Sequence, residues 1–177
     1  PYTFNVAPFL ADPTSVQQGY LTSEPFVIGE TGIEPKVFLL ADSGYASYAA
    51  VIQTSQHLID RNPDLVQRFI DASIKGWYSY LYADPSPANT LIKQENPDMS
   101  DEQLAYSHEI LRRYGLVDSG DASLEGIGMM SRARWKAFFE VMAEDNIFPN
   151  DLDYARAYTL DFIGKRVGMD AVRRGAD

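Results

Sequence analysis

The sequence contains no cysteine and only two histidines, His57 and His108. Without cysteine, the chain has no disulfide, thiolate zinc site, iron–sulfur cluster or cysteine nucleophile. His108 and Glu109 are not followed by the second histidine of an H-E-x-x-H helix, and neither a phosphate-binding G-x-x-x-x-G-K-[ST] loop nor a G-x-S-x-G turn occurs. We therefore expect no metal, no cofactor and no hydrolytic triad.

Basic residues and long apolar runs are also scarce. Lys and Arg total 15 against 25 Asp and Glu, which gives a net charge of −10. Such a field repels phosphate backbones and anionic lipids, so we expect no nucleic acid partner. The longest clear apolar run, residues 37–41, is far shorter than the roughly 20 residues that span a bilayer.

The 177 residues, 45% of them hydrophobic, are enough for one domain or two small lobes with a core. In the first 55 residues, short apolar runs alternate with Gly, Pro, Ser and Asp, a pattern typical of strands. The run at 37–41 is dense enough to be buried on both faces of a sheet. We predict an α/β layer with strands at 2–10, 20–23, 26–28, 37–41 and 49–54 and a short helix at 13–18.

From Asn62 onward the apolar period becomes helical. Asn62 suits an N-cap and Pro63 suits the first helical position, which predicts a helix that ends before Asp84. Further helices are predicted at 87–93, from a capping box at Ser100 to Gly115, at 131–144 and at 154–166. The expected core stripe of the first helix is Leu65, Val66, Phe69, Ile70, Ile74, Trp77 and Leu81.

Three side chains are candidates for ligand binding. Glu24 lies at the expected end of a strand, where α/β sheets place ligand groups, although a turn carboxylate is the alternative. Tyr45 and Tyr48, separated by small residues, suit a planar organic ligand, or else they pack a hinge or strand crossing. We interpret His57 as packed at a strand end and His108 as a boundary residue in mid-helix.

Several motifs in this order resemble the substrate-binding proteins of ABC importers. Within these, the sequence is most similar to the branch that includes binders of thiamine pyrimidine precursors, riboflavin, nitrate and sulfonates. The motifs are Asp12-Pro-Thr-Ser-Val-Gln-Gln-Gly-Tyr-Leu-Thr-Ser-Glu-Pro-Phe26, Leu40-Ala-Asp-Ser-Gly-Tyr45, Asn62-Pro-Asp-Leu-Val-Gln-Arg-Phe69, Lys75-Gly-Trp77 and Asp84-Pro85.

The resemblance implies part of a type 2 periplasmic binding protein fold, an α/β clamp of two lobes. Residues 1–36 would be the end of the second lobe, 37–48 a hinge crossing with a strand at 37–42, and 49–177 a mainly helical part that packs on the first lobe. A signal peptide and the first half would precede Pro1, and the protein would be periplasmic or lipid-anchored outside the cytoplasm. We expect stability only with that missing half or through self-association, because unpaired strand edges and apolar faces would otherwise be exposed.

The resemblance also implies a function and a site. Glu24 would lie at the cleft with Tyr20 and Ser23 beside it, while Ser43, Gly44 and Tyr45 would lie at the crossing between the lobes. The chain would capture a small solute for an ABC permease, without catalysis. Lys36 is the only basic residue between Tyr20 and Tyr45. A planar heterocycle such as a thiamine pyrimidine precursor is therefore favoured over an inorganic oxyanion.

Two alternatives remain. Pyrimidine-precursor synthases with the same fold carry a cysteine-rich segment at the place that corresponds to residues 43–49. This chain has no cysteine there, which disfavours the enzymatic interpretation. A truncated form without ligand binding is the third possibility.

Overall fold

The computed structural model describes residue 3 and residues 5–169. The chain divides into two compact units, the first made of Pro1–Phe38 and Asp84–Leu116 and the second of Leu39–Ala83 and Val117–Asp177. It therefore passes from one unit to the other three times, and the first passage lies within the predicted hinge segment 37–48.

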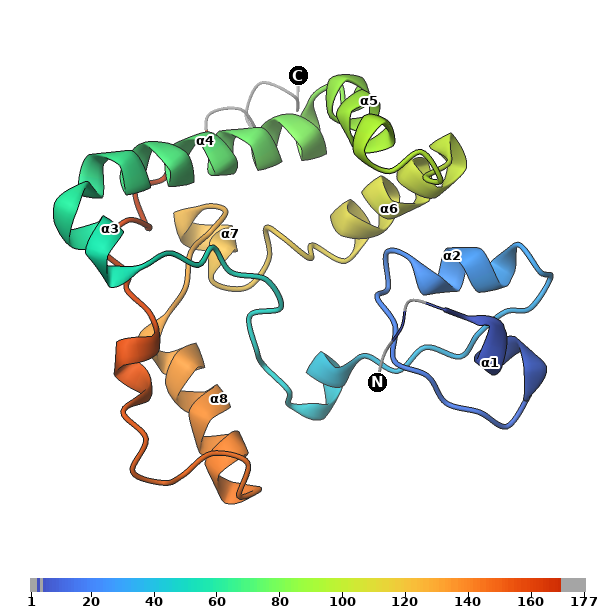
Figure 1. Ribbon diagram of the computed structural model, residues 1–177, viewed down its shortest axis with the longest axis horizontal. Helices are drawn as coiled ribbons and strands as arrows, with labels where there is room; N and C mark the ends of the chain where they lie inside the picture. Colours follow the sequence, from blue (N-terminus) through green and yellow to red (C-terminus); the bar gives the residue numbers. More distant parts are fainter. Residues whose placement is uncertain (1–2, 4, 170–177) are drawn as a thin grey trace. The chain divides into compact units, whose positions relative to one another are not determined.

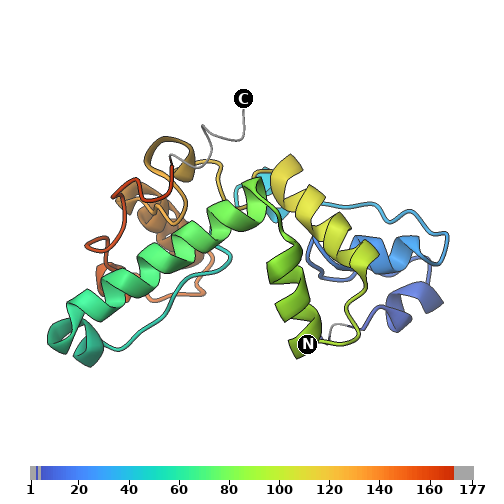
Figure 2. The same cartoon turned by 90° about the horizontal axis from the view of Figure 1, so that it is seen from above.

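Unit 1 is built from four helices, α1 (Ala7–Ala11), α2 (Glu24–Gly29), α5 (Ser86–Glu95) and α6 (Asp101–Arg113). Helix α2 packs against α6 (Figure 2), and the rings of Phe26 and Tyr106 lie 5.4 Å apart between them. Around this contact Ile28, Leu104 and Ile110 are buried. The core of unit 1 is thus a single helix pair.

Unit 2 contains the longest helix, α4 (Pro63–Tyr82), which follows directly on α3 (Gln56–Arg61). Shorter elements complete the unit: η1 (Leu40–Ser43), α7 (Ala122–Glu125), α8 (Arg132–Glu144) and η2 (Tyr154–Ala157). Helix α8 and η2 lie side by side (Figure 1), with Phe139 stacked on Tyr154 at a centroid distance of 4.6 Å.

The caps predicted from the sequence are present. Asn62 accepts a hydrogen bond from the Leu65 N–H at 3.2 Å and begins α4. Ser100 accepts from the Gln103 N–H at 3.0 Å and begins α6. Helices α4, α5, α6 and α8 match the helices predicted from residue 62 to residue 144.

The predicted strands, in contrast, are absent from residue 3 and residues 5–169. A strand is held by hydrogen bonds to a neighbouring strand, and the described residues supply none. Instead, residues 7–10 belong to α1, 26–28 lies inside α2, and 37–41 and 49–54 are irregular apart from the start of η1. Segment 20–23 is a turn. Val37 and Phe38 are exposed, so the expected burial of 37–41 on both faces of a sheet is wrong here.

The short helix predicted at 13–18 is also wrong. Asp12 accepts hydrogen bonds from both the backbone N–H and the hydroxyl of Thr14, at 2.9 and 2.7 Å. This local turn competes with the first turn of a helix, as aspartate side chains commonly do. His57, expected at a strand end, lies exposed in α3, whereas His108 is half-buried in mid-helix as predicted.

Part of the predicted core stripe of α4 faces solvent. Val66, Ile74 and Leu81 are buried, but Phe69 is 60% exposed and Leu65 and Trp77 are 40% exposed. Tyr78 takes a core position instead, and its hydroxyl accepts the Ile127 N–H at 3.2 Å.

The helix predicted at 154–166 is limited to the single turn of η2. Beyond it the chain crosses α4 as an irregular segment: the Phe162 carbonyl accepts from Gln67 Nε2 at 3.1 Å. Gly164 and Arg166 have positive φ angles of 69° and 55°, which a continuous helix cannot accommodate. At Gly168 a Cβ atom would lie 2.7 Å from Tyr78 Cδ2, so a glycine permits this close approach.

Candidate functional site

In unit 1, the predicted site residues Tyr20, Ser23 and Glu24 belong to one tight turn at the start of α2. The Tyr20 N–H donates to Glu24 Oε2 at 2.6 Å, and the Ser23 N–H donates to the Tyr20 carbonyl at 2.9 Å. The Glu24 side chain is buried, with 6% of the residue exposed, while Tyr20 is 53% exposed. Ser23 is half-buried and makes no side-chain cap bond.

Helix α6 holds this turn in place. Ser107 Oγ donates to the Thr22 carbonyl at 2.7 Å, and the Tyr106 hydroxyl donates to the Leu21 carbonyl at 3.2 Å. Burial raises the pKa of Tyr106, which favours the neutral phenol that makes this bond. The turn is therefore anchored both by its own carboxylate and by side chains from a distant part of the sequence.

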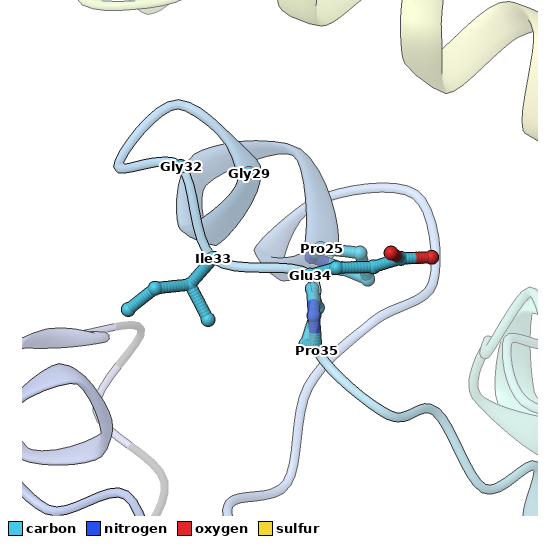
Figure 3. A pocket seen from close by; sticks show the side chains of 6 residues that line it. All are labelled: Pro25, Gly29, Gly32, Ile33, Glu34 and Pro35. Atoms are coloured by element: carbon cyan, nitrogen blue, oxygen red, sulfur yellow. The ribbon is translucent and has the colours of Figure 1, made fainter.

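A shallow hollow of about 400 Å³ lies next to the turn in the same unit (Figure 3). It is open to solvent, and in Figure 3 the side chains of Ile33 and Glu34 point to opposite sides of the loop. Sequence reasoning did not predict this hollow. The glycine and proline residues of the segment are the one sequence feature that points to it. The hollow is lined by Pro25, Gly29, Gly32, Ile33, Glu34 and Pro35.

In unit 2, the predicted residues Ser43, Gly44 and Tyr45 form the end of η1. Gly44 has a φ angle of 89°, and its left-handed conformation lets the Tyr45 N–H donate to the Leu40 carbonyl at 3.1 Å. Ser43 is exposed and Tyr45 is 40% exposed. The Tyr45 ring meets Phe138 of α8 edge-on at 5.4 Å.

Tyr48, three residues further on, is part of the packing of α8. Its hydroxyl donates to the Asp121 carboxylate and accepts the Ser131 N–H at 2.8 Å. The Arg134 guanidinium lies 4.3 Å from the centroid of its ring. Burial is the main cause that raises the pKa of Tyr48, and the hydrogen bond to Asp121 adds to it. Tyr48 is thus packed and hydrogen-bonded within unit 2.

Arg134 is a basic residue near this segment that sequence reasoning missed, because it lies 86 residues further along the chain than Tyr48. Its Nε donates to the Ala46 carbonyl at 2.8 Å, and a terminal nitrogen donates to the Ser47 carbonyl at 3.0 Å. These two bonds direct the guanidinium to backbone carbonyls and fix the segment that follows Tyr45.

The structure therefore brings the six predicted residues together in two separate groups. Tyr20, Ser23 and Glu24 share one turn of unit 1, and Ser43, Gly44 and Tyr45 share one turn of unit 2. Each group offers one partly exposed tyrosine on a backbone that is fixed by hydrogen bonds. Among residue 3 and residues 5–169, no cluster of His, Asp or Glu could hold a metal ion.

Two comparisons with known proteins gave a match. Residues 2–88 match the model of the NMT1/THI5-like family. Over 158 residues, 89% of this chain, the sequence is 28% identical to the riboflavin-binding protein RibY from Chloroflexus aurantiacus. The match covers 44% of that protein, so the chain spans less than half the length of this curated relative. No solved structure matches significantly.

The two matches confirm the resemblance to ABC substrate-binding proteins that the motifs indicated. The family implies a periplasmic binding protein fold, whereas the described residues form helices and no strand. Within the described part of the chain, no helix has the length and apolar character to cross a membrane. Over residues 2–88, this chain is therefore similar to the NMT1/THI5-like family.

Proposed function

We propose that this chain is part of an extracytoplasmic solute-binding protein that delivers a small planar heterocycle to an ABC permease. The observation that carries the proposal is the relationship to RibY, a riboflavin-binding protein, over 89% of the chain. Binding would work through closure of two lobes around the ligand, which stabilises the closed state. The proposal includes no catalytic step, because residues 43–49 contain no cysteine.

The surroundings of the candidate residues support an aromatic ligand. Tyr20 and Tyr45 each expose part of a ring, and a tyrosine offers a flat apolar face with one hydroxyl group for a heterocycle. Both rings are carried by hydrogen-bonded turns, so binding would cost little ordering of the backbone. We propose Tyr20, Ser23, Glu24, Ser43, Gly44 and Tyr45 as the residues that form or shape the ligand site.

The basic side chains near these turns give little support to an oxyanion. Lys36 lies 5.0 Å from the centroid of the Phe38 ring, and Arg134 donates to the carbonyls of Ala46 and Ser47. An oxyanion site would call for arginine or lysine donors aimed at the ligand. We therefore favour an organic heterocycle over nitrate or a sulfonate as the ligand.

A ligand panel on the full-length protein tests the proposal. Riboflavin, a thiamine pyrimidine precursor, nitrate and taurine would each be added in a thermal melt read by circular dichroism, with equilibrium dialysis for any ligand that stabilises. We expect a planar heterocycle to raise the melting temperature and nitrate and taurine to leave it unchanged. Tyr45→Ala should weaken binding, and the equally exposed Leu65→Ala serves as the control. Stabilisation by nitrate or taurine alone would contradict the proposal.

A further inference from the structure

Glu24 is a buried carboxylate inside a turn, and its position suggests a role different from ligand contact. Only 6% of the residue is exposed, and Oε2 lies 2.6 Å from the Tyr20 backbone nitrogen. The turn closes on itself a second time, because the Glu24 N–H donates to the Tyr20 carbonyl at 3.3 Å. Residues 20 and 24 are therefore joined by two hydrogen bonds, one of them through the carboxylate.

Gly19 lies in close contact with the Glu24 side chain. A Cβ atom at Gly19 would lie 3.1 Å from Cβ and Cγ of Glu24 and 3.2 Å from its Oε2. A side chain at position 19 would crowd Glu24, whose side chain would have to shift by a few tenths of an ångström. The absence of a side chain at Gly19 and the length of the glutamate at position 24 thus fit each other.

We propose that Glu24 is a positioning residue that fixes the Gly19–Glu24 turn and thereby the exposed Tyr20 ring, and that it does not act as a counter-ion for the ligand. This inference rests on the proposed function and deepens it. Oε2 accepts the Tyr20 N–H, and only 6% of the residue is exposed, so little of the carboxylate is open to a ligand. The consequence is that removing the charge of Glu24 should not change the preference between a neutral ring and a protonated amine.

The test separates position from charge with two substitutions at one site. Glu24→Gln removes the charge but keeps an amide oxygen that can accept from Tyr20, whereas Glu24→Ala removes the acceptor. Glu30, exposed at the end of the same helix, provides the control Glu30→Gln. Gly19→Ala is a second way to displace the carboxylate without altering it.

The first readout is hydrogen exchange at the Tyr20 amide, which needs no ligand. We expect Glu24→Ala to speed exchange at least about tenfold, because one charge-assisted hydrogen bond is lost, and Gly19→Ala, which crowds the carboxylate, to speed it less. Glu24→Gln should restore most of the protection, and Glu30→Gln should leave it unchanged. Equal protection in wild type and Glu24→Ala would overturn the positioning role.

The second readout is the ratio of affinities for riboflavin and a protonated aminopyrimidine, measured by equilibrium dialysis on the full-length protein. We expect the ratio to be the same in wild type and Glu24→Gln. A loss of about tenfold or more for the aminopyrimidine alone, with the Tyr20 amide still protected, would overturn the inference in favour of a ligand carboxylate. If neither compound binds the wild type, the proposed function fails, and the exchange measurement still decides the role of Glu24.

Discussion

At the scale of single residues, Tyr48 connects three segments of unit 2. Its hydroxyl donates to the Asp121 carboxylate and accepts the Ser131 N–H, and its ring lies under the Arg134 guanidinium. The pKa of Tyr48 is raised first by burial and then by Asp121, so the fold favours the neutral phenol. The Tyr48 hydroxyl therefore stabilises the fold while it is protonated.

We expect Tyr48→Phe to lower the free energy of unfolding by about 1–3 kcal/mol at neutral pH, because Asp121 and Ser131 lose a buried partner while the cation–π contact remains. A pKa raised in the folded state gives stability that is complete below the unfolded value of about 10 and is lost above it. The difference between wild type and Tyr48→Phe should therefore shrink as the pH rises past about 10.

Urea unfolding followed by circular dichroism across this pH range measures that difference. Tyr80 and Tyr106, whose pKa values burial also raises, are common to both proteins and cancel in the comparison. Tyr45→Phe is the control, since the Tyr45 ring contact with Phe138 is kept. A difference that stays constant into alkaline solution would argue against the hydroxyl network.

At the scale of elements, two N-caps of unit 2 have unequal surroundings. Asn62 accepts only from the Leu65 N–H among the bonds described for its side chain. Ser131 accepts from the Arg134 N–H at 3.2 Å and also donates to Asp121 at 3.1 Å. The cap of α8 is thus also part of the Tyr48 network.

Asn62→Ala should cost about 1 kcal/mol, the usual effect of a lost cap. Ser131→Ala should cost more, because it removes the cap and one donor to Asp121 together. Urea unfolding of both variants and of Ser86→Ala, which changes a first-turn residue of α5 without a side-chain cap role, gives the comparison. Equal losses at Asn62 and Ser131 would mean that the bond to Asp121 contributes nothing.

The elements also show what the sequence could predict and why. Helices α4, α6 and α8 were predictable because period and caps are local properties of the chain. Strands are not local, since each needs a partner, and the described residues supply none. Helix α2 has only six residues, too few to show a helical period, so its apolar residues resembled a strand.

The candidate site residues stay a prediction, and the structure adds their surroundings. Tyr20, Glu24 and Tyr45 were chosen from motifs, and residues 2–88, which contain them, match the NMT1/THI5-like family. That Glu24 bonds within its own turn follows from backbone geometry, which no spacing reveals. Arg134 reaches the segment after Tyr45 from α8, a long-range contact without a local signal.

At the scale of the molecule, unit 1 has a small core and a large apolar surface. Among its described residues, Ile28, Leu104 and Ile110 are the buried large hydrophobic side chains. More than twice as many large hydrophobic side chains are exposed. The exposed set is Val16, Tyr20, Ile33, Val37, Phe38, Leu91, Tyr114 and Leu116.

We expect the 177-residue chain, expressed by itself, to self-associate through unit 1 unless a further polypeptide segment covers this surface. Phe38→Ser should reduce association in light scattering over a dilution series. Leu124→Ser is the matched control, because Phe38 and Leu124 are both 73% exposed and Leu124 lies in unit 2. A monomer that melts cooperatively at all concentrations would contradict this expectation.

The two tryptophans both lie in one of the two units, so their fluorescence reports on that unit. Trp77 and Trp135 are the chain's full set, and both belong to unit 2, where Trp135 stacks on Tyr158 with the ring centroids 4.6 Å apart. Indole emission therefore follows the opening of unit 2 alone, whereas far-ultraviolet circular dichroism follows the helices of both units. Transitions that coincide would show the units unfolding as one, and transitions that separate would resolve two folding units within one short chain.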